Sequence, residues 1–227
     1  MWQISNLSLV FAFLTLAATA DDIEKARDAQ DRAGLEKLVG DVRAAAKPTD
    51  AASQYRLALA ESYLAEVVQE LRDKNAARSA AEGGMDAARK AIALKPDNAE
   101  YHRILGTLCG QVIPALGLAG MKYGKCAQES VNQALKLNPN LLEGYMARGV
   151  GNYYLPAALG GGYELALKDF EKAAQMNPKY ADPHLWMGLS LRKQNKNAQA
   201  RMEFQKALDL NPNRVWARQQ LDKTPAQ

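Results

Sequence analysis

The sequence has few of the residues from which metal centres and catalytic sites are built. Its 227 residues include only two cysteines and two histidines, which do not form a convincing zinc-ligand pattern. It also lacks the G-x-S-x-G, H-E-x-x-H and P-loop motifs of hydrolases, metalloproteases and nucleotide-binding proteins. We therefore expect a protein that is not an enzyme and holds no metal or cofactor.

A concentrated run of positive charge is also missing. The net charge is +4, from 29 basic and 25 acidic residues, and the two signs alternate, as in Asp169, Glu171 and Lys172. Nucleic-acid binding needs a basic stripe that follows phosphates, so we expect no nucleic-acid partner. Residues with β-branched side chains are sparse and alanine is abundant, which favours helices over strands.

The first 20 residues contain no charged side chain. Their apolar run from Leu7 to Ala18 is too short to span a bilayer comfortably, and it ends in Ala18-Thr19-Ala20, the small-x-small pattern of a signal-peptidase site. We expect residues 1–20 to be a signal peptide cleaved near Ala20, giving an exported, periplasmic or secreted protein without a membrane span. Because no Lys or Arg precedes the run, an uncleaved anchor or a chain start that omits basic residues stays open.

Four prolines, each next to an Asn or Asp, divide the rest of the chain. Pro96, Pro139, Pro178 and Pro212 each close an amphipathic run, and their spacings are 43, 39 and 34 residues. Proline cannot continue a helix, so each one marks a helix end. A regular break with a period near 34 predicts a solenoid of helical hairpins.

The last repeat is the most regular. Its motif residues, in order, are His184, Met187, Gly188 and Leu191 in a first helix, then Ala200, Phe204 and Ala207 in a second. This pattern resembles the tetratricopeptide repeat (TPR), W-x2-L-G-x2-Y followed by A-x3-F and P, with histidine in place of the aromatic residue. The resemblance implies that Gly188 and Ala200 lie where the two helices cross closely.

Looser copies precede it. Their motif residues are Tyr145, Arg148, Gly149, Ala166, Phe170 and Ala173; then His102, Leu105, Gly106, Ala127, Val131 and Ala134; and Leu57, Ala58, Gly84, Ala88 and Ala91 in a degenerate copy. We expect an all-α, TPR-type α-solenoid of antiparallel hairpins, with about four repeats in residues 51–221. Residues 21–50 are expected to be an N-terminal helical pair that turns near Ala33-Gly34. A capping helix carrying Trp216 should end the array, before a flexible tail at 222–227.

Two repeats are longer than the rest because of similar inserts between their helices. Residues 112–120 and 154–162 each have an aliphatic residue and a proline, a short apolar stretch, and then glycines. We expect Pro114 and Pro156 to break the first helices, and the glycines to turn the chain. These inserts either pack back on the array or form a binding lip. They are similar to inserts in a group of exported bacterial TPR proteins, which favours a periplasmic setting.

Both cysteines and both histidines fall within repeats. Cys109 and Cys126 are placed to join the two helices of one hairpin, and either a disulfide or two buried thiols fits them. His102 and His184 occupy equivalent positions two repeats apart, where they replace packing aromatics.

The resemblance to TPR proteins implies a concave groove lined by the first helices. Helical spacing places these candidate partner-binding residues there: Arg103, Thr107, Gln111, Met146, Val150, Tyr153, Tyr154, Trp186 and Arg192. Aromatic residues beside arginines suit a peptide segment of a partner protein. We therefore expect a non-catalytic scaffold in the cell envelope. The alternative is a small-ligand or transporter-accessory protein whose pocket the apolar inserts close over Tyr153, Tyr154 and Tyr163.

Overall fold

The computed structural model describes residues 19–116 and 121–226, and its elements there are eleven α-helices and one 3-10 helix. In order these are α1 (Ala20–Asp28), α2 (Arg32–Ala45), α3 (Ala51–Glu70), α4 (Lys74–Leu94), α5 (Ala99–Leu116), α6 (Met121–Leu137), α7 (Leu142–Tyr154), η2 (Ala157–Leu159), α8 (Tyr163–Met176), α9 (Asp182–Lys193), α10 (Asn197–Leu210) and α11 (Val215–Asp222).

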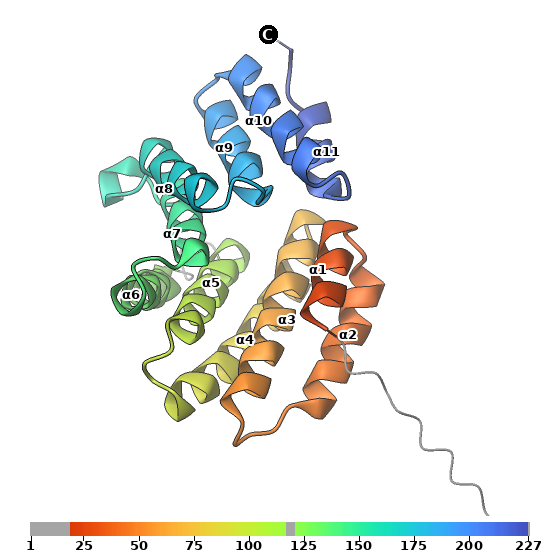
Figure 1. Ribbon diagram of the computed structural model, residues 1–227, viewed down its shortest axis with the longest axis vertical. Coiled ribbons are helices and arrows are strands. Elements are labelled where there is room, and N and C mark those ends of the chain that lie inside the picture. Colours follow the sequence, from red (N-terminus) through yellow and green to blue (C-terminus); the bar gives the residue numbers. More distant parts are fainter. Residues whose placement is uncertain (1–18, 117–120, 227) are drawn as a thin grey trace, which may run out of the picture.

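These helices pair into antiparallel hairpins that follow one another around a curve (Figure 1). The pairs α3–α4, α5–α6, α7–α8 and α9–α10 are the four expected repeats, α1–α2 is the N-terminal pair, and α11 follows the last repeat. The predicted all-α TPR solenoid is therefore confirmed. Across the described ranges, no helix is both long and apolar enough to cross a membrane. Most of the predicted signal peptide lies outside the described residues.

The two helices of a repeat cross closely at a glycine, as the motif implies. A Cβ atom added to Gly188 would lie 2.6 Å from the Phe204 ring, and one added to Gly149 would lie 2.5 Å from the Phe170 ring. Both rings are completely buried. Glycine at these positions lets each aromatic ring fill the space between the two helices of its hairpin.

The aromatic or histidine position that opens each first helix has a structural role in two repeats. The Tyr145 hydroxyl donates to the carbonyl of Pro139 at 3.0 Å, and His102 Nε2 lies 2.7 Å from the carbonyl of Pro96. Both side chains thus satisfy the carbonyl of the proline that separates two hairpins. His184 instead pairs with Glu203 of α10 at 2.7 Å, so the two histidines do not share a site.

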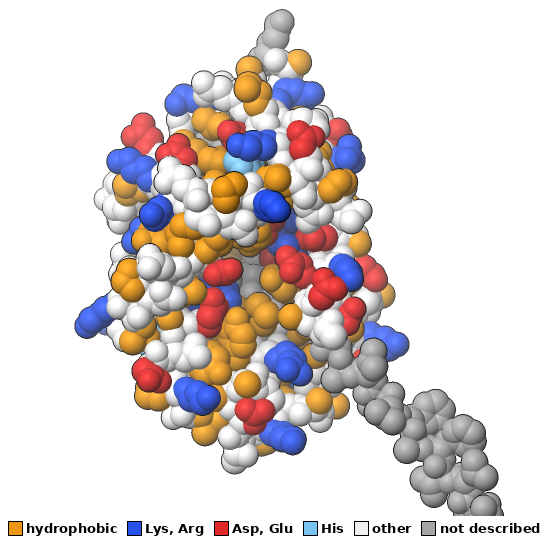
Figure 2. Space-filling view, in the orientation of Figure 1, with side chains coloured by type: hydrophobic (Ala, Val, Ile, Leu, Met, Phe, Trp, Pro, Cys, Tyr) orange, Lys and Arg blue, Asp and Glu red, His pale blue; other side chains and the backbone are white. Residues whose placement is uncertain are grey.

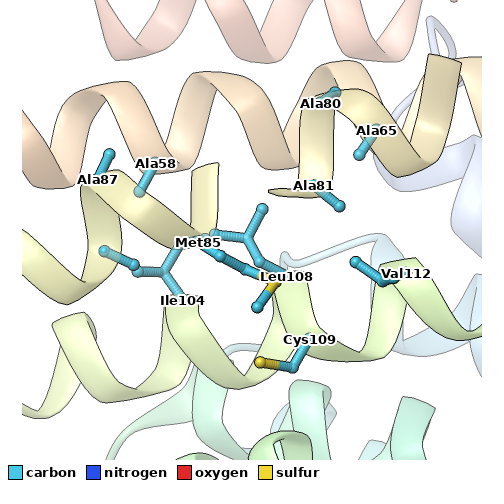
Figure 3. Close-up of a cluster of buried hydrophobic side chains, with 11 residues drawn as sticks. Ala58, Ala65, Ala80, Ala81, Met85, Ala87, Ile104, Leu108, Cys109 and Val112 are labelled. Atoms are coloured by element: carbon cyan, nitrogen blue, oxygen red, sulfur yellow. The ribbon is translucent and has the colours of Figure 1, made fainter. Parts of the chain in front are cut away.

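A buried cluster of small and branched side chains holds α3, α4 and α5 together (Figure 3). Met85 of α4 meets Leu108 of α5 in its centre, and the surrounding alanines let the helices approach closely. Cys109 belongs to this cluster and forms a disulfide with Cys126 of α6, with 6.0 Å between their Cα atoms. The disulfide joins α5 and α6, the two helices of the second repeat.

Three local predictions were wrong. The N-terminal pair turns at residues 29–31 rather than at Ala33-Gly34, because the Asp31 side chain caps α2 by accepting from the Gly34 N–H. Pro114 does not break its helix but lies in the last turn of α5, which ends at Leu116, so the one backbone hydrogen bond that a proline removes is lost only at the end of the helix. The C-terminal tail is not free, since Thr224 is 2% exposed and its hydroxyl and carbonyl oxygens accept from Arg192 and Arg201.

The second insert has the expected turn but does not pack down on the array. α7 ends at Tyr154, and Gly160 and Gly162 have φ angles of 86° and 118°, which glycine adopts without strain. Pro156 and the η2 residues are exposed, and Leu159 is 60% exposed. Part of the first insert, residues 117–120, lies outside the described residues.

Candidate partner-binding surface inside the ring

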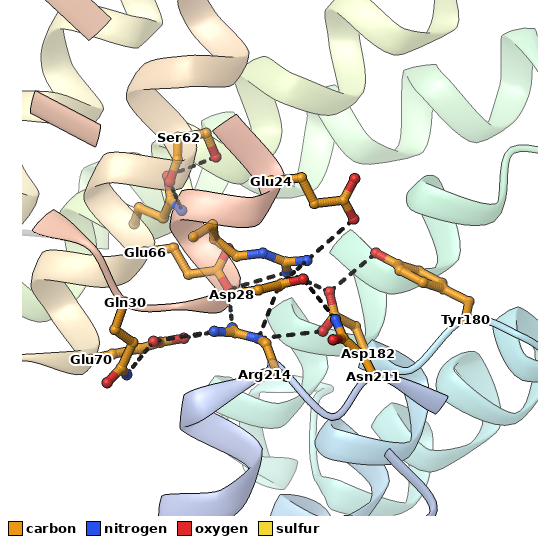
Figure 4. Close-up of polar contacts among 12 residues, drawn as sticks. Glu24, Asp28, Gln30, Ser62, Glu66, Glu70, Tyr180, Asp182, Asn211 and Arg214 are labelled. Carbon is orange, nitrogen blue, oxygen red and sulfur yellow. Dashed lines mark hydrogen bonds and ion pairs between the residues drawn. The ribbon is translucent and has the colours of Figure 1, made fainter. Parts of the chain in front are cut away.

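The two ends of the array meet, so the solenoid closes into a ring (Figure 1). Arg214, in the turn between α10 and α11, reaches across to α3 (Figure 4). Its Nη2 atom donates to Glu66 at 2.6 Å and to Glu70 at 2.7 Å. Residues about 145 positions apart are thereby joined, and the Arg214 side chain is only 1% exposed.

A second arginine makes the same connection from the N-terminal side. Arg27 of α1 donates through Nη1 to Asp182 at the start of α9 at 2.5 Å, and pairs with Asp28 at 2.9 Å. Asn211, at the end of α10, donates to Asp28 at 2.6 Å. Side chains from α1 and α3 thus contact both ends of the last repeat, and we call Arg27, Asp28, Glu66, Glu70, Asp182 and Arg214 the closing network.

Burial and crowding shift the pKa values of two of its carboxyl groups in opposite directions. Burial, together with the neighbouring carboxylate of Glu66, raises the pKa of Glu70 to about 7, although Arg214 works against this. Burial would also raise the pKa of Asp182, but Arg27 and Arg214 hold it below its ordinary value. Asp182 therefore keeps its negative charge between the two arginines, and Glu70 is the carboxylate of the pair that is more easily protonated.

The ring surrounds a hollow that is visible in the space-filling view (Figure 2). Apolar and acidic side chains gather around this hollow. One part of its wall comes from α7, α9 and α11, which bring four aromatic side chains together. Trp186 is the centre of this aromatic group, with ring centroids 5.5 Å from Tyr153, 6.2 Å from Tyr154 and 5.6 Å from Trp216.

The aromatic group is only partly covered. Tyr154 is 54% exposed, and Tyr153, Trp186 and Trp216 are half-buried. Tyr163 lies beside Tyr153 at 5.4 Å. Burial and the nearby carboxylates of Glu66 and Glu70 raise the pKa of the Tyr154 hydroxyl, so this tyrosine lies where the aromatic group meets the acidic face of α3.

The arginine of the predicted groove is committed to contacts within the scaffold. Arg103 is 8% exposed, and it donates to Glu100 at 2.8 Å and lies 3.4 Å from the Tyr55 hydroxyl. Gln111 exchanges hydrogen bonds with Ser62 of α3. These side chains hold α5 against α3, so neither is free to contact a partner.

Four more of the predicted residues are also held by the scaffold. Thr107 donates to the Arg103 carbonyl, and Met146 is 8% exposed in the core between α7 and α8. Val150 packs against that core. Arg192 donates to Gln220 and Thr224, which holds α11 in place. Of the nine predicted residues, Tyr153, Tyr154 and Trp186 come together on one partly exposed surface.

The closing network was missed by the sequence analysis. Glu66 and Glu70 are one helical turn apart on α3, a spacing that places two carboxylates on one face. This was the one available signal, because neither glutamate has a basic partner on its own helix. No local pattern indicates that Arg27 and Arg214 from opposite ends of the chain meet the same acids.

A family model described as "Regulator of microtubule dynamics protein 1-3" matches residues 16–155, more than half of the chain. The chain belongs to this family. The regulator of microtubule dynamics match ends where α7 has just ended, and a separate tetratricopeptide repeat model matches residues 181–214, which form α9 and α10.

This family member is also similar to individual TPR proteins. Human tetratricopeptide repeat protein 6 is 36% identical over 93 residues, which are 40% of this chain and only 18% of that protein. The structure of TTC0263, a TPR protein of Thermus thermophilus, is similar with a TM-score of 0.56 and 16% identity, over 87% of this chain and 97% of that one. YrrB, described as a TPR protein with an unusual peptide-binding site, gives 0.44 and 20% over 89% and 91%.

Proposed function

We propose that this protein is a non-catalytic interaction module that holds a segment of a partner protein against the inner face of its ring. The observation that carries the proposal is the partly exposed aromatic group formed by Tyr153, Tyr154, Trp186 and Trp216. Tyr and Trp dominate the binding energy of protein interfaces, because they bury large areas at a small entropic cost.

The rest of the inner face supports this proposal by being rigid. Arg103, Gln111 and Arg192 tie α5 and α11 to their neighbours. The aromatic surface is therefore held in a fixed geometry before any partner arrives, which lowers the entropic cost of binding. Within the described residues, no group of three or more metal-ligating side chains is arranged to hold a metal.

The family name suggests where a partner can be sought. Members are described as regulators of microtubule dynamics, so we propose proteins of the microtubule system as the first candidates. Export through a signal peptide ending near Ala20, also a proposal, would place the protein in another compartment. Sequencing the N-terminus of the protein purified from its native cells decides between the two, since an intact start rules out cleavage there.

The proposal is tested by site-specific photo-crosslinking. A benzoylphenylalanine residue at position 154 should give crosslinks to one partner segment in native cells, because this side chain stands on the aromatic surface. The matched control is position 202, where Met202 is 73% exposed on α10. If position 154 captures no partner, or captures the same mixture as position 202, the inner face is not the binding surface.

A further inference from the structure

The inner wall of the ring differs in charge from the chain as a whole. The chain has a net charge of +4, whereas the wall made by the closing network and its neighbour Glu24 contains five carboxylates and only two arginines. With all groups ionised, this is an excess of three negative charges. A wall of opposite sign to the chain favours partners that the outer surface would repel.

The arginine side chains in this wall are buried, whereas two of the acidic side chains are partly exposed. The side chains of Arg27 and Arg214 are 4% and 1% exposed, whereas those of Glu24 and Glu66 are 49% and 25% exposed. A molecule that reaches this part of the wall therefore meets the carboxylates of Glu24 and Glu66 rather than the guanidinium groups of Arg27 and Arg214. Figure 2 shows acidic side chains on opposite sides of the hollow.

The aromatic group lies next to these carboxylates. The phenol of Tyr154 is close enough to Glu66 and Glu70 for their charges to raise its pKa. Aromatic faces attract cations through their negative π-electron density, most strongly when water is partly excluded. Rings and carboxylates together form a surface suited to a cationic side chain.

We propose that the segment bound inside the ring is basic, with a lysine or arginine side chain against Tyr154 and Trp186 and its charge near Glu66 and Glu24. This inference rests on the proposed function and names the chemistry of the partner. Acidic segments are disfavoured, because their carboxylates would face an uncompensated negative wall. Uncharged segments gain the aromatic contacts but lose the electrostatic attraction.

Two matched peptides test the inference, one of three Ser-Lys-Leu repeats and one of three Ser-Glu-Leu repeats. Both are measured against the folded protein by fluorescence anisotropy and by the emission of Trp186 and Trp216. The lysine peptide should bind at least about tenfold more tightly, with an affinity that falls as salt rises. Equal binding, or tighter binding of the glutamate peptide, overturns the proposal.

Charge-neutralising variants identify the surface involved. Glu24→Gln should weaken the lysine peptide about fivefold, and this residue is only peripheral to the closure, since its Oε1 atom is 3.4 Å from Arg27. Glu66→Gln should do the same. Glu171→Gln, at an exposed position on α8, changes the net charge equally and should have no effect. If all three variants behave alike, the inner wall does not select the peptide.

The crosslinked segment separates failure of this inference from failure of the proposed function. If position 154 captures a specific segment rich in Lys or Arg, both stand. A specific segment that is acidic or uncharged leaves the proposed function intact and overturns the inference. Absence of any specific segment overturns both.

Discussion

Removing Arg214 should open the ring. This side chain is 1% exposed and donates to two carboxylates from α3, at 2.6 and 2.7 Å. Removing one partner from a buried ion pair costs about 3–5 kcal/mol, because the remaining charges stay buried without compensation. Arg214→Met keeps most of the apolar stem, so its cost reflects the lost charge. Small-angle X-ray scattering should show a larger radius of gyration, and urea denaturation a lower stability.

The control for this prediction is Arg148→Met. Arg148 makes a bidentate pair with Asp169, but within one hairpin and with 41% of its side chain exposed, so its loss should cost at most about 1 kcal/mol and leave the radius of gyration unchanged. Adding Glu70→Gln to Arg214→Met should recover part of the lost stability, because it removes one uncompensated charge. If Arg214→Met matches the Arg148 control in both stability and shape, the ends are not held together by this network.

Three further predictions concern pH, packing and the disulfide. The pKa of Glu70 is raised in the folded state from 4.5 to about 7, so its stabilising contribution is complete at low pH and is lost as the pH rises through about 7. Glu70→Gln should therefore flatten the pH dependence of the urea midpoint between about pH 5 and 7.5, and an unchanged profile contradicts this. Gly188→Ala places a Cβ atom 2.6 Å from the Phe204 ring and should lower the stability by about 1–3 kcal/mol. Gly151→Ala, whose Cβ atom would have nothing within 4 Å, should raise the stability by about 0.5–1 kcal/mol. Equal effects of the two variants in thermal unfolding contradict the crossing geometry. Cys109 and Cys126 close a loop of 17 residues, so a reductant should remove about 3 kcal/mol from the wild type and nothing from the double Cys→Ala variant.

The repeats could be predicted from the sequence because their determinants are local. Gly188 and Phe204 belong to one hairpin, and the space between its helices requires a glycine opposite an aromatic ring. His102 and Tyr145 are further examples, since each hydrogen-bonds to a proline carbonyl only six residues earlier. Such contacts depend on spacing along the chain, which a sequence shows directly.

Ring closure could not be predicted in the same way. Whether Arg27 reaches Asp182, 155 residues away, depends on small rotations that accumulate over four hairpins. The same uncertainty explains the outcome for the groove residues. Helical spacing correctly placed Arg103 on an inner helix, but only the packing of α3 against α5 shows that Tyr55 also contacts its guanidinium group. The aromatic group was easier to predict because its members project from consecutive first helices.

Closure of the ring also has a consequence for kinetics. A continuous polypeptide that passes through a closed ring can enter it only by threading one of its own ends, or by waiting until the ring opens. A segment from the middle of a folded partner has no end to thread. Its observed binding rate should therefore stop rising with partner concentration once it reaches the rate at which the ring opens. That plateau is set by the ion pairs of Arg27 and Arg214. The same ion pairs would then lengthen the lifetime of the complex, because a captured segment would have to wait for the next opening to escape.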